Sequence, residues 1–149
     1  MNHSSIQQRY RNQLTEQLVY FDEEKDEFLQ EYFPHNDRHR LLVERTLSVY
    51  CSTLEKLIVH PSTNDMINEF ALIGSRVDVY FLESQSVESF TFVFPTKTDP
   101  DRSMISFLSP IGFQLLLSRR NEVYEINIPS GKTQVRIEGI LFSNHGGFK

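Results

Sequence analysis

Hydrophobic residues in the first part of the chain follow the spacing of an α-helix. From about Ser4 to Tyr32 there is no glycine or proline. A heptad seam runs through this stretch, formed by Leu14, Leu18, Phe21, Phe28 and Tyr32. Only Lys25 interrupts the seam, at a position where an apolar residue is due. The pattern predicts a long helix that ends at Phe33-Pro34, since proline and the residue before it do not continue a helix.

A second heptad stripe follows within a few residues. Asn36 or Asp37 can cap the new helix, and His60-Pro61 ends it. Its stripe consists of Val43, Leu47, Tyr50, Leu54 and Leu57. Two such helices joined by about four residues must fold back on each other, because neither can bury its stripe alone. Residues 1–64 are therefore predicted to form an antiparallel coiled-coil hairpin, with straight arms of ~36 to 43 Å.

The second half of the chain changes to the two-residue period of β-strands. Apolar and polar residues alternate over 76–81, 89–94, 124–128 and 134–137, and a short strand starting at Ile105 leads into a Ser-Pro corner. Between them Pro110 leads an apolar segment suited to one short helix. Residues 65–149 are thus predicted to form an antiparallel β-sheet with one helix on one face, which makes the whole chain α+β.

Composition limits the classes of partner and location. The chain has 149 residues, 39% of them hydrophobic, and a net charge of −5. An acidic chain is not expected to bind nucleic acid directly or sequence-specifically, because such binding depends on Lys and Arg neutralising phosphates. No window approaches the ~20 apolar residues of a membrane span and no signal peptide is visible, so we expect a cytoplasmic protein that does not contact membranes. Cys51 is the only cysteine, which excludes an internal disulfide and favours a buried thiol.

Three short motifs occur in one order behind the predicted hairpin. They are Gly74-x-x-Val77, Ile105-Ser106-x-x-Ser109-Pro110-Ile111 and Pro129-Ser130-Gly131. Together they resemble the C-terminal domain of the Gre transcript-cleavage factors, transcription elongation factors that bind bacterial RNA polymerase. The resemblance runs from Gly74 to about Phe142, roughly half of the chain. It implies an N-terminal coiled-coil hairpin followed by a C-terminal domain of FKBP-like fold.

The resemblance also implies a partner and a docking point. In Gre factors the C-terminal domain contacts the rim of the RNA polymerase secondary channel through the Ser-Pro corner, while the hairpin enters the channel. Ser109 and Pro110 are the matching polymerase-binding positions here, and any link to DNA is indirect, through the polymerase. Taken from the residues alone, Ser109 is an ordinary helix cap and Pro110 an ordinary first helical residue. The two roles are compatible.

The hairpin tip departs from the family pattern. In Gre factors an Asp and a Glu three residues later hold a second Mg²⁺ at the polymerase active centre, which suits the preference of this ion for carboxylate oxygens. Here Asp37 is followed three residues later by Arg40. The resemblance thus implies a regulator without full cleavage chemistry, neither an enzyme nor a cofactor-binding protein in itself. The alternative is a genuine cleavage factor that pairs Asp37 with Glu31 and uses the polymerase's Mg²⁺.

The remaining polar residues of the tip allow two further interpretations. Arg38, His39 and Arg40 could contact phosphates of RNA or nucleotide. His35, Asp37 and His39 could be imagined as metal ligands, although three such residues without a fourth are a weak signal. We expect the tip to be polar and exposed, without a metal site.

Functions of another class stay open. A peptidyl-prolyl isomerase on the FKBP-like fold would need an aromatic pocket, but the available phenylalanines alternate along strands and are better explained as core residues. The hairpin could alternatively serve as a plain interaction module that pairs with a second copy. Lys25 in the seam argues against a dry oligomeric coil and favours a monomer.

Overall fold

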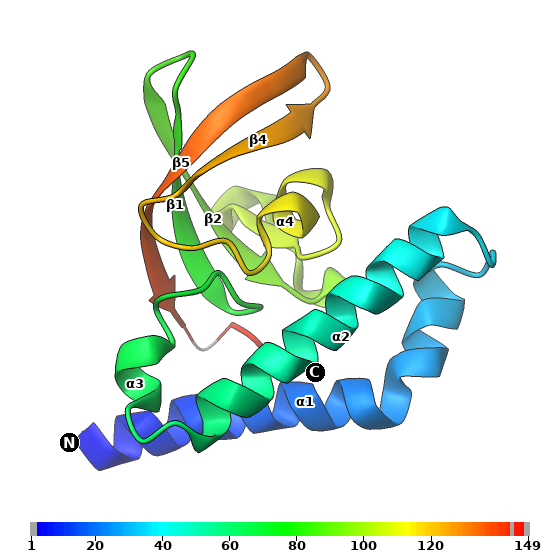
Figure 1. Cartoon of the computed structure of the whole chain (residues 1–149), viewed down its shortest axis with the longest axis vertical. Helices are drawn as coiled ribbons and strands as arrows, with labels where there is room; N and C mark the ends of the chain where they lie inside the picture. The colour runs from blue at the N-terminus through cyan, green and yellow to red at the C-terminus, as the bar shows by residue number, and fades with distance from the viewer. Residues whose placement is uncertain (1–2, 144, 148–149) are drawn as a thin grey trace. The chain divides into compact units, whose positions relative to one another are not determined.

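The computed structural model of the chain describes residues 3–143 and 145–147 (Figure 1). It divides into two compact units, Met1–Thr63 and Asn64–Lys149. Helices α1 (His3–Tyr32) and α2 (Arg38–Val59) make up the first unit, and a short helix α3 (Thr63–Met66) begins at its boundary with the second. The class is α+β, as the sequence predicts.

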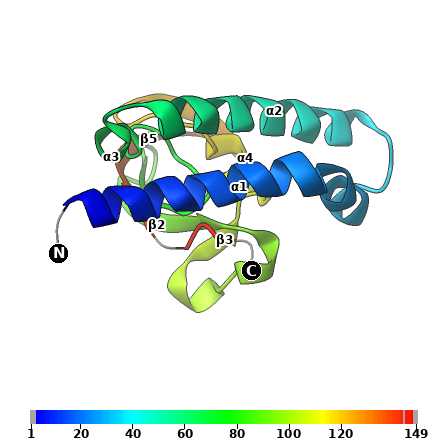
Figure 2. The ribbon, with the colours of Figure 1, turned by 90° about the horizontal axis from the view of Figure 1, so that it is seen from below.

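Helices α1 and α2 form an antiparallel hairpin with unequal arms. They contain 30 and 22 residues and are joined by a turn over residues 33–37. Figures 1 and 2 show the two helices side by side, and in both views the last turns of α1 bend away from the axis of its longer first part. The hairpin prediction is confirmed, but the expected straight arms are not.

The hairpin core follows the predicted stripe on α2 but not on α1. On α2 the buried residues are those of the predicted seam: Val43, Leu47, Tyr50, Leu54 and Leu57. On α1 two predicted core residues, Leu18 and Tyr32, are only half-buried, while Gln17 and Leu29 are buried. The Tyr50 hydroxyl donates a hydrogen bond to the Gln17 side chain, so that a polar group is satisfied inside the hairpin.

The second unit is a five-stranded sheet with the order β3-β2-β1-β5-β4. Its strands are β1 (Ser75–Phe81), β2 (Ser86–Val93), β3 (Met104–Ser106), β4 (Val123–Ile128) and β5 (Gly131–Phe142). All neighbouring pairs are antiparallel except β2 and β3, which are parallel. The expectation of an antiparallel sheet is therefore wrong for β3. Two short 3₁₀ turns, Pro95–Lys97 and Pro100–Arg102, lead the chain back before β3, so β3 runs in the same direction as β2.

Helix α4 (Pro110–Leu115) lies against the sheet close to β4 (Figure 1). The core of this unit is built from alternate residues of the central strands, including Val77, Val79, Val135 and Ile137, together with Leu115 of α4. A register shift between β1 and β5 occurs at Asp78/Val79. In the described part of the chain, no helix is both long and apolar enough to cross a membrane.

Candidate functional site

The Ser-Pro corner is a pair of consecutive turns, each held by one serine. The Ser106 hydroxyl accepts a hydrogen bond from the Leu108 N–H (3.0 Å), and the Ser106 carbonyl accepts one from the Ser109 N–H (2.9 Å). The Ser109 hydroxyl then accepts from the Gly112 N–H (3.1 Å) and so caps α4, with Pro110 as the first helical residue. The capping role of Ser109 follows from these contacts, because the first N–H groups of a helix have no partner within it.

Gly112 allows the corner to close. A Cβ atom at this position would lie 2.4 Å from the Ser106 carbonyl oxygen and 2.9 Å from the Ser109 hydroxyl oxygen. Any side chain would therefore push the first turn of α4 off the preceding turn. Sequence reasoning did not single out Gly112, although an isolated glycine inside an apolar helix is a known sign of close packing.

A glutamine fixes α4 against the edge of the sheet. The Gln114 amide nitrogen donates to the carbonyl oxygens of Pro110 (2.8 Å) and Asn127 (2.9 Å), and its amide oxygen accepts from the Asn127 N–H (2.7 Å). Asn127 lies near the end of β4. Gln114 thus sets the distance between the corner and the β4–β5 turn, a role that nothing in the sequence pattern indicated.

An apolar groove lies between the corner and the β4–β5 turn. It has a volume of about 230 Å³ and is lined by Phe90, Ile105, Ser109, Pro110, Ile111, Asn127, Ile128 and Pro129. Both residues named by the sequence, Ser109 and Pro110, border it, and Pro110 is exposed. Grooves of this kind take an apolar anchor from a binding partner.

The second predicted site, the hairpin tip, is organised by Asp37. This residue caps α2, where its carboxylate accepts from the Arg40 N–H (3.0 Å). That hydrogen bond is the main reason why the pKa of Asp37 lies below its ordinary value of 3.8. The N–H of His39 and the nearby His39 and His35 side chains lower this pKa further. The carboxylate is thus ionised at neutral pH and engaged with the backbone of its own helix.

Arg40, three residues after Asp37, connects the two arms of the hairpin at the tip. Its guanidinium donates to the carbonyl of Phe33 (3.1 Å), in the turn after α1, and to the carboxylate of Glu44 (3.3 Å). Its side chain is only 19% exposed. Arg40 was a candidate phosphate contact, but here its guanidinium joins the start of α2 to the end of α1.

Glu31 is the other candidate for cleavage. It lies exposed in the last turn of α1. The pKa of Tyr32 is raised, mainly by burial of its hydroxyl and secondly by the negative charge of Glu31. Glu31 is not among the groups that shift the pKa of Asp37. Within residues 3–143 and 145–147, no three His, Cys, Asp or Glu side chains form a group that could hold a metal ion. His35, Asp37 and His39 are thus not gathered as metal ligands.

A hollow lined by aromatic and imidazole rings is present at the tip. Its volume is about 310 Å³ and its lining residues are Tyr32, Phe33, Pro34, His35, Asp37 and His39. The rings of Phe33 and His39 meet edge to face, with centroids 4.9 Å apart and planes at 80°. The sequence named most of these residues but gave no sign that they enclose a hollow.

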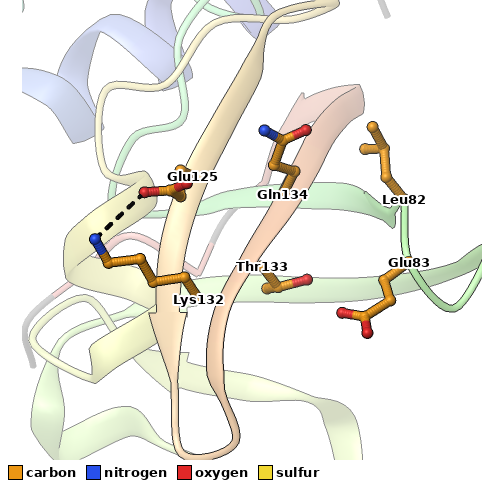
Figure 3. A pocket seen from close by; sticks show the side chains of 6 residues that line it. All are labelled: Leu82, Glu83, Glu125, Lys132, Thr133 and Gln134. Atoms are coloured by element: carbon orange, nitrogen blue, oxygen red, sulfur yellow. Dashed lines mark ion pairs between the residues drawn. The ribbon is translucent and has the colours of Figure 1, made fainter.

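A third hollow, of about 370 Å³, lies at the end of the β4–β5 hairpin and the β1–β2 turn (Figure 3). Figure 3 shows Lys132 reaching toward Glu125, with an ion-pair distance of 3.7 Å, while Leu82 and Glu83 lie on the other side of Gln134. Both partners of this ion pair are more than half exposed, and such pairs contribute little. The hollow brings together none of the residues named by the sequence.

Comparison with known proteins shows which family shares this arrangement. Residues 66–142 match the family model described as "Transcription elongation factor, GreA/GreB, C-term". Transcription elongation factor GreA of Desulfovibrio desulfuricans is 32% identical over 71 residues, which cover 48% of this chain and 44% of that protein. The GreA of Alkaliphilus oremlandii is 37% identical over 73 residues, covering 49% and 46%. The chain therefore spans about half the length of these curated relatives.

A solved structure has the same fold. The transcription elongation factor GreA/GreB of Nitrosomonas europaea aligns with a TM-score of 0.53 and 24% identity, covering 80% of this chain and 93% of that chain. Because the family model matches more than half of the residues, the chain belongs to the GreA/GreB family of transcription elongation factors. The matched region holds the Ser-Pro corner and its groove, whereas the hairpin tip lies outside it.

We expect Gly112→Ala to destabilise the second unit by about 1 to 3 kcal/mol, because the added methyl group overlaps a backbone carbonyl in a packed corner. Thermal unfolding followed by near-ultraviolet circular dichroism measures the change. Gly147→Ala is the matched control, since a Cβ atom there meets no atom within 4 Å. Equal stability of the two variants would contradict the close approach at Ser106.

We expect the Asp37 cap to make hairpin stability dependent on acid pH. The pKa of Asp37 is lower in the folded state than its ordinary value of 3.8, so its contribution is complete above that value and is lost as the pH falls through the folded pKa. Asp37→Asn keeps a capping group but removes this titration. Urea unfolding at pH 6 and pH 3 should therefore show a smaller loss in Asp37→Asn than in the native chain. Asp26→Asn, on α1, is the control and should behave like the native chain.

Proposed function

We propose that this protein is a Gre-like transcription factor that binds RNA polymerase at the secondary channel and modulates transcription without full transcript-cleavage chemistry. Membership of the GreA/GreB family supports the choice of partner. In this proposal the protein has no catalytic activity of its own and acts on the polymerase as a monomer. Its net charge of −5 favours a protein partner over direct contact with duplex nucleic acid.

The proposed docking surface is the corner with its apolar groove. Ser109 holds the first turn of α4 in place, and Pro110 is exposed beside the groove. Gln114 keeps the opposite wall, which ends in Ile128 and Pro129, at a fixed distance. A pre-formed apolar groove loses little conformational entropy when a partner fills it, which favours binding.

The hydrogen bonds of Arg40 are the main support for a protein that does not stimulate transcript cleavage. A carboxylate at this position would be needed to complete an acidic pair with Asp37. Instead a guanidinium bonds to Phe33 and Glu44, and Asp37 itself is used as a helix cap. A cation beside Asp37 also repels a divalent metal ion at the tip. The hairpin would then act by occupying space or contacting nucleotide rather than by supplying a metal ion.

Binding to core RNA polymerase should separate the structural role of Ser109 from its contact role. Ser109→Asp retains a good helix cap but places a charge at the apolar groove, and Pro110→Asp does so without touching the cap. We expect both variants to weaken the complex by about tenfold or more, a change of roughly 1.4 kcal/mol. Biolayer interferometry with immobilised polymerase measures the dissociation constants.

Ser84→Asp, in the exposed β1–β2 turn, adds the same charge far from the corner in the fold and should bind as the native chain does. Full affinity of both Ser109→Asp and Pro110→Asp would refute the docking assignment. If Ser109→Ala alone weakened binding, the serine would act only through the fold of the corner.

Backtracked transcription complexes test the chemistry. With Mg²⁺ present, we expect the native protein to leave the rate of transcript shortening at the level of the polymerase alone, because the residue three positions after Asp37 is Arg40, a cation bonded to Phe33 and Glu44. Denaturing gel electrophoresis of labelled RNA measures that rate. Acceleration by the native protein that disappears in both Asp37→Ala and Glu31→Gln would instead establish the alternative, a cleavage factor that uses these two residues.

A further inference from the structure

The hollow at the hairpin tip contains binding groups that the docking surface does not use. Phe33 and His39 form two ring walls at nearly a right angle, and Tyr32 and Pro34 complete an apolar lining. Its volume of about 310 Å³ is at the lower end of ligand pockets. A flat ring system can lie against one of the two rings and meet the edge of the other, which is the preferred geometry of aromatic groups.

The electrostatics of the tip indicate the charge of the ligand. The first turn of α2 contains no acidic residue and its Arg38 is exposed, whereas the guanidinium of Arg40 is already bonded to Phe33 and Glu44. The start of the helix adds partial positive charge, part of which the Asp37 carboxylate offsets. His35 and His39 add imidazoles to the same turn. These groups disfavour an ammonium ligand and favour an anion, for which Arg is well suited when the anion is a phosphate.

We propose that the hairpin tip binds a single nucleotide, with its base in the hollow against Phe33 and His39 and its phosphates beside Arg38 and the start of α2. The ionised Asp37 carboxylate lines the same hollow and can accept hydrogen bonds from the amino group of a base. Base stacking on aromatic rings tolerates any base, so the carboxylate adds only a preference for bases that carry an amino group, and uridine nucleotides should bind most weakly of the four.

A free nucleotide fits the hairpin better than the end of an RNA strand. The acidic segment 22–27 lies on α1 of the same hairpin, and the chain has a net charge of −5. A longer polyanion would approach these carboxylates, whereas one nucleotide needs only the tip. The ligand of the tip is therefore a mononucleotide.

Titration of the full chain with ATP in the absence of divalent ions tests the inference. Two-dimensional ¹H–¹⁵N NMR should show saturable shifts confined to the backbone amides of residues 32, 33 and 35–40. Phe33→Leu keeps an apolar side chain but removes the ring, and His39→Leu changes an exposed residue, so we expect each to weaken ATP binding by about tenfold or more. Arg45→Gln, exposed on α2, is the control and should bind normally.

Three further probes identify the ligand class. Adenosine and inorganic triphosphate should each bind more weakly than ATP, since each lacks one half of the recognised chemistry. Triphosphate binding equal to that of ATP would overturn the base contact, and tighter binding of a short oligoribonucleotide would overturn the choice of a mononucleotide. Circular dichroism measures helicity and so shows whether the Phe33→Leu variant still folds. If this variant folds and both it and His39→Leu bind ATP with unchanged affinity, the site is also refuted.

The polymerase-binding experiments distinguish this inference from the proposed function. The docking groove lies in the second unit and the hollow in the first. Loss of ATP binding in Phe33→Leu should therefore leave binding to core polymerase within about twofold of the native value. No response to ATP in a chain that binds polymerase normally would refute the nucleotide site alone.

Discussion

The start of a helix leaves backbone N–H groups without partners, and both candidate sites depend on how this constraint is met. At the corner, the Ser109 hydroxyl accepts from the first turn of α4. At the hairpin tip, the Asp37 carboxylate does the same for α2. In each case the capping residue also fixes the direction in which the chain enters the helix. Pro110 and His35, which lie next to these caps in the sequence, are exposed.

The two caps have different chemical consequences. A hydroxyl cap is neutral and leaves the neighbouring groove apolar, which suits contact with an apolar side chain of a partner. A carboxylate cap brings a negative charge to the tip. Because backbone N–H groups already donate to this carboxylate, it interacts less strongly with an external cation. Arg40 strengthens this effect by joining the two arms of the hairpin. The Arg40 guanidinium thus connects the turn after α1 to the first turns of α2 at the tip.

Periodicity and motif order were sufficient to predict the hairpin, the sheet and the family, because these depend on local patterns. Every predicted core residue of α2 is buried, and Asp37 was one of two expected caps. The seam of α1 was less accurate, since Gln17 is polar and its burial depends on Tyr50 from the other arm. The parallel direction of β3 depends on how the two preceding 3₁₀ turns return the chain. Arg40 donates to the carbonyl of Phe33, 7 residues away, and Gln114 donates to the carbonyl of Asn127, 13 residues away. Such tertiary hydrogen bonds have no periodic trace in the sequence.

Gln114 also determines where the sheet ends. Its amide donates to and accepts from Asn127 as the backbone of a sixth strand would, so the outer edge of β4 is occupied at that residue. By alternation, the outward backbone groups of β4 are then those of Val123, Glu125 and Asn127. Open edges are where sheets of different molecules join and aggregate. A single side chain thereby shortens the stretch of β4 on which another strand could add.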